Sequence, residues 1–361
     1  MVVLDKQFEC GQCGASLKFA PGSTNLNCPY CGHANAIATL DTTVDEQDYL
    51  AALANTAAVH ETEERMEVKC TSCGASATLG PNVAADECPF CGTPIVKTGE
   101  AKRVFKPEGV LPFKIRTEEA RTAFREWIQS LWFAPNALKR RAKQSERLQG
   151  VYIPFWTYDC RTGTHYTGQR GEHYWVTEMR PVIVNGKTEM RAQQVRKTRW
   201  YPASGFVRNT FDDVLVLASE SLPKDKTDAL DPWDLHNLAP YQDDYLSGFK
   251  AESYQVNLET GFEYAKYKMD PIIRDTIRRD IGGDEQRIHQ CATQYDAITF
   301  KHILLPIWIS AYRYHNKIYR FLVNGRTGEV QGERPWSWIK ITLAVLAGAL
   351  VAGGIYMATQ M

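Results

Sequence analysis

Residues Cys28–Asn35 read CPYCGHAN and residues Cys88–Ile95 read CPFCGTPI, so the chain carries one short cysteine hook twice. Each hook follows another Cys-x-x-Cys pair after fourteen intervening residues, and the whole pattern recurs at an offset of sixty residues. Several glycine, alanine, serine and proline positions match as well, which indicates an internal repeat. Its eight cysteines are Cys10, Cys13, Cys28 and Cys31, then Cys70, Cys73, Cys88 and Cys91.

This spacing predicts two zinc ribbons, each with four thiolates around one Zn²⁺ ion. A tetrahedral site needs sulfurs about 2.3 Å from the metal, and a Cys-x-x-Cys turn brings two of them together. The glycine after the second cysteine of each pair suits the left-handed backbone of such a turn. A redox pair would be followed by a helix, whereas GASLKF after Cys13 is typical of a strand. We expect zinc rather than iron, a structural role, and no catalytic residue.

Composition places the rest of the chain among ordinary globular proteins. The 361 residues include 42 basic and 42 acidic side chains, and the length suffices for two or three domains. Cys160 and Cys291, the cysteines outside the repeat, are isolated, which favours a reducing cytosolic setting over disulfides. The opening MVVLDKQFEC lacks the pattern of a signal peptide.

The C-terminal region predicts one membrane-spanning helix. Residues 341–357 contain no charge, and with its neighbours this segment reaches the roughly 20 residues that cross a bilayer. Trp336 and Trp338 precede it, where an interfacial aromatic belt would lie. Because Arg334 and Lys340 also precede it, we expect a tail-anchored, single-pass protein of the inner (cytoplasmic) membrane with its N-terminal bulk in the cytoplasm.

The soluble part is predicted to be α+β, with a β-rich domain that carries packed helices. Apolar periodicity predicts helices over 117–133 and 258–283. Aromatic and β-branched runs predict strands over most of 150–220 and 294–330, with turns at 185–186, 315–316 and 324–325. We divide the chain into zinc ribbon 1 (1–40), an acidic linker (41–65), zinc ribbon 2 (66–98), an α+β cytoplasmic domain (99–335) and a transmembrane anchor (336–361).

Local signals add finer expectations. Thr117 is expected to cap the first helix, and Pro271 to kink or divide the second. Prolines 112, 154 and 306 share an apolar-Pro-apolar setting, which predicts strand edges, first positions or bulges. The linker carries six net negative charges and is expected to be a solvated spacer with a short helix. The basic run LKRRAKQSER at 138–147 is interpreted as a solvated helix face, with anionic lipid as the alternative ligand.

Enzyme motifs are weak. VIVNGKT resembles the end of a phosphate-binding loop, but Pro181 occupies the position that the motif reserves for glycine. The best polar cluster lies in 159–175, where Gly168 and Gly171 indicate a loop or tight hairpin. We interpret it as a turn held by its own salt bridges, and a ligand groove is the alternative. Its polar members are Asp159, Arg170 and Glu172.

Nucleic-acid binding, which zinc ribbons often perform, is disfavoured by charge. Residues 1–40 carry two basic and two acidic side chains, and residues 66–98 carry two basic and three acidic ones. Binding to a phosphate backbone relies on several lysines or arginines at each site. Nearly neutral ribbons favour protein partners instead.

With these features in view, the chain resembles a bacterial family of double zinc-ribbon proteins with one C-terminal membrane span. The resemblance rests on the paired ribbons, on YIPFWTYD followed by YTGQRG, and on LLPIWISAYRY and NGRTGEVQGERPWS before the span. Such chains are often labelled primosomal protein N′ (replication factor Y), a label that the missing motor motifs do not support. Relatives in the YdjG-like branch of bacilli imply partners among phage-shock-type and flotillin-like membrane-stress proteins.

The sequence therefore predicts a membrane-anchored zinc-ribbon adaptor that mediates protein–protein interaction at the cytoplasmic face. A membrane-tethered nucleic-acid-binding or replication-associated protein is the alternative, and an enzyme that uses the 159–175 cluster is a third. Small residues also recur on one face of the predicted span, which permits a homo-oligomer through it. These small residues are Ala344, Gly348 and Ala352.

Overall fold

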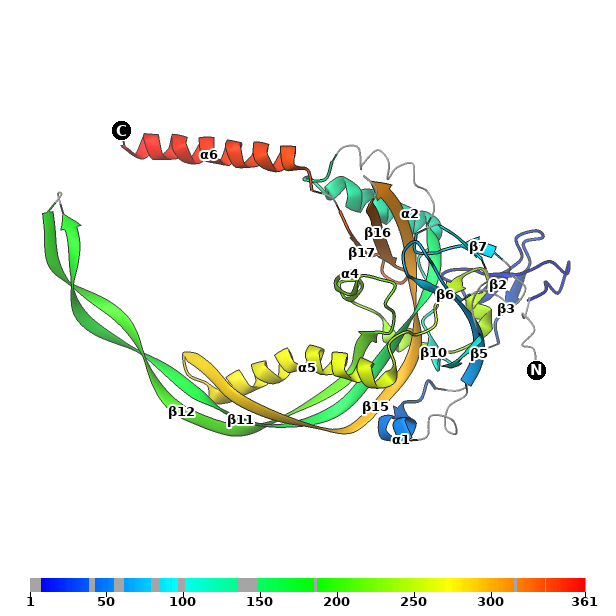
Figure 1. Ribbon diagram of the computed structural model, residues 1–361, viewed down its shortest axis with the longest axis horizontal. Coiled ribbons are helices and arrows are strands. Elements are labelled where there is room, and N and C mark those ends of the chain that lie inside the picture. Colours follow the sequence, from blue (N-terminus) through cyan, green and yellow to red (C-terminus); the bar gives the residue numbers. More distant parts are fainter. Residues whose placement is uncertain are drawn as a thin grey trace.

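The structure of the protein is a computed structural model that confirms the α+β class. A curved, β-rich sheet carries a few helices, with two small cysteine-rich modules at one end and an apolar helix at the C-terminus (Figure 1). The described residues are 8–38, 43–54, 62–78, 85–91, 93–96, 101–135, 148–184, 187–314, 317–334 and 336–360.

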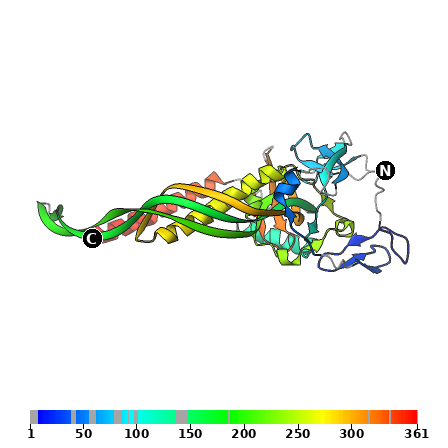
Figure 2. The same cartoon turned by 90° about the horizontal axis from the view of Figure 1, so that it is seen from below.

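Three long antiparallel strands form the sheet, in the order β12-β11-β15. They are β11 (Gln149–Val184), β12 (Lys187–Leu217) and β15 (Glu285–Tyr314). Val184 pairs with Lys187, which confirms the hairpin, although its two turn residues lie outside the described part of the chain. Figures 1 and 2 show that the β11–β12 hairpin leaves the body and extends well beyond β15.

The expected loop at Gly168 and Gly171 is wrong, because both residues lie inside β11. A Cβ at Gly168 would lie 2.2 Å from the carbonyl oxygen of Arg287 on β15. A Cβ at Gly171 would lie 2.9 Å from the ring of Trp200 on β12. Here glycine allows close approach of neighbouring strands and does not mark a turn.

Helix α5 (Leu258–Ile281) lies along the concave side of the long strands (Figure 1). Its predicted inward positions are all buried, and they pack against aromatic residues of the sheet. The helix runs continuously through Pro271 and ends at Gly282, whose φ is +65°. The buried positions are Leu258, Phe262, Ala265, Met269, Ile273 and Ile277.

Short strands complete the body end of the nine-stranded sheet in the described chain. They are β4 (Gln47–Asp48), β10 (Gly109–Val110), β13 (Ala239–Pro240), β14 (Lys250–Ala251), β16 (Lys317–Asn324) and β17 (Val330–Gly332). The turn expected at 324–325 joins β16 to β17 and is confirmed. Helix α4 (Lys224–Asp228) and the 3₁₀ segments Leu235–Asn237 and Asp243–Leu246 lie in the connections.

Pro154 and Pro306 lie where a strand exchanges partners, and Pro112 follows β10 outside any strand. On β11, pairing with β14 ends at Tyr152 and pairing with β12 begins at Phe155, so Pro154 lies in the gap. On β15, Pro306 lies between the segments that pair with β10 and β16. A residue without an N–H fits these gaps because no ladder hydrogen bond is required of it there.

Helix α2 (Thr117–Ser130) packs on the body beside strands β16 and β17 (Figure 1). Its cap is Arg116 and not Thr117, because Glu119 accepts a hydrogen bond from the Arg116 backbone N–H at 2.7 Å. Phe124 stacks on Phe321 of β16 with ring centroids 3.7 Å apart. The basic run at 138–147 lies outside the described residues.

The acidic linker is not simply a solvated spacer. Strand β4 pairs with β15, and helix α1 (Tyr49–Ala54) follows it directly. Tyr49 and Ala52 are buried against the α5 side of the sheet, and the ring of Tyr49 lies 5.0 Å from that of Phe262. Residues 43–54 of the linker therefore belong to the folded body.

Helix α6 (Trp338–Gln360) is a candidate membrane span by length and composition. It extends from the body on the same side as the β11–β12 hairpin (Figures 1 and 2). Its N-terminal end is attached to the residues after α2, where Lys340 Nζ donates to the carbonyl oxygens of Trp132 and Ala134 at 3.1 and 2.9 Å.

Candidate metal centres

Ribbon 1 is a small antiparallel sheet with two turns that carry the cysteines. Its strands are β1 (Lys18–Phe19), β2 (Asn25–Asn27) and β3 (Ala34–Ala36). Gly14 N–H donates to the Cys10 carbonyl at 2.9 Å, and Gly32 N–H donates to the Cys28 carbonyl at 3.0 Å. Both glycines have φ near +73°, the left-handed conformation that closes each Cys-x-x-Cys turn.

Ribbon 2 repeats this arrangement. Gly74 has φ +75° and donates to the Cys70 carbonyl at 2.9 Å, whereas Gly92 lies outside the described residues. The chain enters and leaves the ribbon through paired strands, because Thr62 lies opposite Phe105. Its strands are β5 (Thr62–Lys69), β6 (Ser76–Thr78), β7 (Ala85–Glu87), β8 (Pro94–Val96) and β9 (Ala101–Phe105).

The four sulfurs of each ribbon have the spacing of a tetrahedral thiolate site. In ribbon 1 the Sγ–Sγ distances are 3.6 Å for Cys10–Cys31 and 3.5 Å for Cys13–Cys28. In ribbon 2 they are 3.6 Å for Cys70–Cys91 and 3.7 Å for Cys73–Cys88. Four sulfurs about 2.3 Å from one zinc ion would lie about 3.8 Å apart. Both groups could therefore bind a metal ion, and their geometry is consistent with zinc.

The thiol pKa values are divided within each group: some are lowered, whereas those of Cys13 and Cys31 in ribbon 1 and Cys91 in ribbon 2 are raised. The backbone N–H of Gln12 donates to the Cys10 sulfur and lowers the pKa of that thiol to about 6. The hydrogen bond from Cys88 lowers the pKa of Cys73 to about 5, and the same interaction raises the pKa of Cys88. A bound Zn²⁺ would stabilise all four thiolates together, with release of the protons.

The two hooks differ sharply in exposure. Tyr30, in the Cys-Pro-Tyr-Cys hook of ribbon 1, is 81% exposed, whereas Phe90 at the matching position of ribbon 2 is 0% exposed. Phe90 belongs to the hydrophobic cluster that contains Leu111, Val151 and Phe155 of the body. The hook of ribbon 2 is thus part of the core, whereas that of ribbon 1 faces solvent from Pro29 onward and only Cys28 is buried.

Ribbon 1 contacts the body through its strands instead of through this hook. Phe19 N–H donates to the Ser247 carbonyl at 3.0 Å, and Ser247 Oγ donates to the Leu17 carbonyl at 2.7 Å. The ring of Phe19 packs against those of Tyr245 and Phe249, with centroids 5.4 and 6.3 Å away. These contacts leave the exposed hook directed away from the body.

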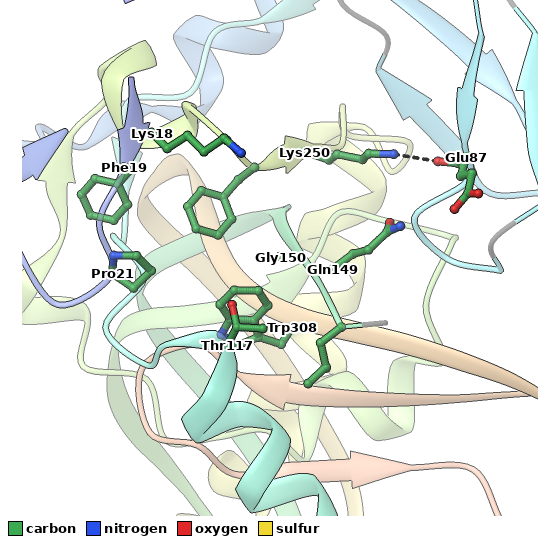
Figure 3. A pocket seen from close by; sticks show the side chains of 12 residues that line it. Lys18, Phe19, Pro21, Glu87, Thr117, Gln149, Gly150, Lys250 and Trp308 are labelled. Carbon is green, nitrogen blue, oxygen red and sulfur yellow. Dashed lines mark hydrogen bonds between the residues drawn. The ribbon is translucent and has the colours of Figure 1, made fainter. Parts of the chain in front are cut away.

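A cavity of about 520 Å³ lies where both ribbons meet the body (Figure 3). Ribbon 1 contributes Lys18 and Phe19, ribbon 2 contributes Glu87, and β11 begins beside them at Gln149. Lys250 Nζ donates to the Glu87 carbonyl at 2.7 Å and so ties ribbon 2 to the wall of the cavity. The two ribbons are therefore linked through the body.

The predicted 159–175 cluster does not converge. Arg170 and Glu172 form a half-exposed ion pair of 3.0 Å, but Asp159 lies eleven residues away along the same strand, roughly 36 Å. Asp159 instead lies near Glu46 and Asp212, and their carboxylate oxygens are within 4.8 Å of one another.

Sequence reasoning missed the buried lysine beside this acidic group. Lys301 Nζ lies 2.8 Å from Asp213 and 3.4 Å from Glu46, and its side chain is 11% exposed. The available signal was a single charge in the apolar run ITFKHILLPIWIS. Its partners could not be identified, because Glu46 lies 255 residues away in the chain.

Comparison with known proteins finds one informative relative. The chain is 26% identical over 367 aligned positions to uncharacterized protein YdjG of Bacillus subtilis (strain 168), covering 98% of this chain and 96% of the relative. No family model matches the chain, and no solved structure matches it significantly. The likeness to YdjG thus spans both ribbons, the sheet and the apolar helix, and nothing found supports the primosomal label.

Proposed function

We propose that the chain is a membrane-anchored adaptor in which ribbon 1 docks a protein partner and ribbon 2 is structural. The exposure of Tyr30 carries this proposal. Two repeats that match in spacing place one hook aromatic in solvent and the other in the core. A large exposed aromatic beside a rigid metal turn is the kind of residue that anchors protein interfaces.

The charge of ribbon 1 favours a protein partner over nucleic acid. Residues 1–40 have no net charge, so the ribbon lacks the basic surface that phosphate binding requires. Zinc would hold the hook rigid without taking part in chemistry, because four thiolates leave no open position on the metal. The apolar helix α6 would tether this docking module to the cytoplasmic face of the inner membrane.

Membrane-stress proteins are the first partner class to test. The resemblance to double-ribbon proteins of the YdjG-like branch implies phage-shock-type and flotillin-like partners. Both classes act at membranes, where a tail-anchored adaptor would hold its ribbon. Replication or transcription components would be the expected partners under the alternative function.

The test compares partners captured by the full chain and by Tyr30→Ala, after detergent extraction from native membranes. Tyr267→Ala is the matched control, because Tyr267 on α5 is 76% exposed and lies far from the hook in sequence. A partner that requires Tyr30 is expected to bind at least about tenfold more weakly to Tyr30→Ala, equivalent to an interface hot spot. Its binding to Tyr267→Ala should match that of the wild type.

Binding should then be repeated with the purified partner and with nucleic acid across a salt titration. Direct binding that depends on Tyr30 supports the adaptor. Nucleic-acid binding with a steep salt dependence, or partner binding that survives Tyr30→Ala, would refute it.

A further inference from the structure

No strand or helix of the described chain covers the outer part of the β11–β12 hairpin, which is held only at its base, where Glu285 contacts His173 and Thr198. Strand β15 begins at Glu285, opposite Gly171, and α5 ends at Ile281. Beyond that point only residues 172–184 and 187–199 remain, paired with each other. We call residues 172–199 the distal hairpin. An isolated two-stranded hairpin is marginally stable in water, so this one needs a further surface to bind.

The pairing register divides the distal hairpin into two unlike faces. One face carries Trp175, Met179 and Met190, which are 63%, 58% and 57% exposed. Pro181 and Ala192 share this face, because they pair with Met190 and Met179 respectively. Among the described side chains of this face, a single one is a lysine, arginine, aspartate or glutamate. It is Arg196, which lies opposite Trp175.

The opposite face carries most of the charges, several of them paired with each other, together with Tyr174, Val176, Val182 and Val195. Glu178 binds Lys197 at 2.5 Å and Arg180 at 3.3 Å, and Arg191 binds Glu189 at 3.2 Å. These pairs are well exposed and suit contact with water. The two faces thus differ in charge, and the most exposed large apolar side chains lie on the Trp175 face.

The distal hairpin also carries a net positive charge. Residues 172–199 contain six lysines and arginines and three glutamates, a net charge of three positive units in a chain that is neutral overall. Arg196 beside the exposed Trp175, together with this net positive charge, matches the headgroup region of an anionic bilayer, where aromatic rings and cations both find partners.

We propose that the distal hairpin binds the surface of an anionic lipid bilayer through its Trp175–Met179–Met190 face. The candidate span α6 leaves the body on the same side as the hairpin, which brings a membrane to that side (Figures 1 and 2). Attachment through α6 raises the effective concentration of the bilayer for the hairpin. Arg196, opposite Trp175, then contacts a lipid phosphate, and the apolar side chains of this face enter the interface. The other basic residues lie on the far face and add only longer-range attraction to the anionic surface.

The membrane explains the hairpin better than a second copy of the chain does. Two copies that joined these faces would bring like net charges of three units together, whereas an anionic surface neutralises them. The inference rests on the membrane anchor of the proposed function, so anchoring must be measured separately.

The experiment uses the full chain reconstituted into vesicles, with a photoreactive p-benzoylphenylalanine at position 179. The same residue at position 193 is the matched control, because Gln193 is exposed on the opposite, charged face. We expect lipid adducts from position 179 and at least about tenfold fewer from position 193. Vesicles with phosphatidylglycerol should yield at least about tenfold more adduct than phosphatidylcholine vesicles, because several net charges act together.

Resistance of the chain to alkaline extraction reports insertion of α6 independently. Three outcomes with α6 inserted would overturn the hairpin inference alone. They are the absence of lipid adducts, equal adducts from positions 179 and 193, and cross-links to a second copy of the chain. Chain that is extracted by alkali would overturn both the anchor and the inference. In a further set of variants the photoreactive residue is at position 175. Met179→Glu should reduce its cross-linking to lipid about tenfold, whereas Gln193→Glu, with the same charge change, should leave most of that cross-linking.

Discussion

Lys301 is a charged residue that the sheet holds almost entirely away from water. Its ammonium contacts Asp213 and Glu46, which come from β12 and from the residue before β4. Thr299, on the same strand, donates to Glu46 at 2.8 Å. A buried charge that loses its partner is far more costly than a broken surface pair. This network therefore fixes the linker segment against the sheet.

Asp159 gives the network a pH dependence. Burial raises the pKa of Asp159 to about 6, so the folded state holds its proton more tightly than the unfolded state does. The contribution of Asp159 to stability is then complete below about pH 4 and is lost as the pH rises through about 6. Glu46 acts in the opposite sense, because its hydrogen bond from Thr299 lowers its pKa.

Asp159→Asn should remove this dependence while it keeps an oxygen for the Asp213 N–H. We expect the variant to gain roughly 1–3 kcal/mol over wild type as the pH rises from about 4 to 7. Urea unfolding across that pH range measures the difference, and the exposed neighbour Asp212→Asn is the control. Parallel curves for wild type and Asp159→Asn would show that Asp159 does not titrate as described.

At the scale of the elements, α5 is fitted to the sheet by one close approach. Gly261 lies against β11, where an added Cβ would lie 2.3 Å from the hydroxyl oxygen of Tyr158. That hydroxyl donates to the Leu258 carbonyl at 2.7 Å, so it cannot move without loss of a buried hydrogen bond. Alanine favours a helix by about 1 kcal/mol over glycine, but this gain is smaller than the cost of the overlap.

We expect Gly261→Ala to lower the free energy of unfolding by roughly 1–3 kcal/mol. In a Tyr158→Phe background the same substitution should cost less, because the clashing hydroxyl is absent. A double-mutant cycle by urea unfolding measures this coupling. Additive effects of the two substitutions would contradict the packing described.

Elements could be predicted from the sequence where neighbouring residues in the chain determine them. The inward face of α5 followed from its 3.6-residue period, and the metal turns followed from cysteine spacing and glycine. The length of β11 did not, because Gly168 and Gly171 look like turn residues and only the neighbouring strands show why they are there. The different roles of Tyr30 and Phe90 were equally hidden, since both are aromatic residues in matching hooks.

At the scale of the whole molecule, the two ribbons join the body in different ways. Ribbon 2 contributes Cys70, Cys88 and Phe90 to a cluster with the centre of the sheet. Ribbon 1 likewise contributes Cys10 and Cys28 to a cluster with the body, but its Cys13 and Cys31 are exposed, whereas Cys73 and Cys91 of ribbon 2 are half-buried. A chelator should therefore reach the metal of ribbon 1 more easily.

We expect zinc-loaded protein to release two metal ions in two phases, with ribbon 1 emptied first. Loss of the first ion should perturb the body less, because Tyr30, Cys13 and Cys31 are exposed and ribbon 1 keeps its strand contacts through Phe19. Loss of the second should expose the Phe90 cluster, with a cost comparable to removing a buried aromatic residue, roughly 3–5 kcal/mol. Zinc release with a colorimetric chelator, followed beside hydrogen exchange of β11 and β15, separates the two events.

Two variants assign the phases. Cys13→Ser should abolish the fast phase, and Cys73→Ser should abolish the slow one and accelerate exchange in the sheet. Acidification should release both ions, because protons compete for the thiolates that hold them. Simultaneous release of both ions, or exchange in the sheet that responds equally to either variant, would mean that the ribbons support the body alike. The exposed hook of ribbon 1 would then be no freer than its buried counterpart to serve a partner.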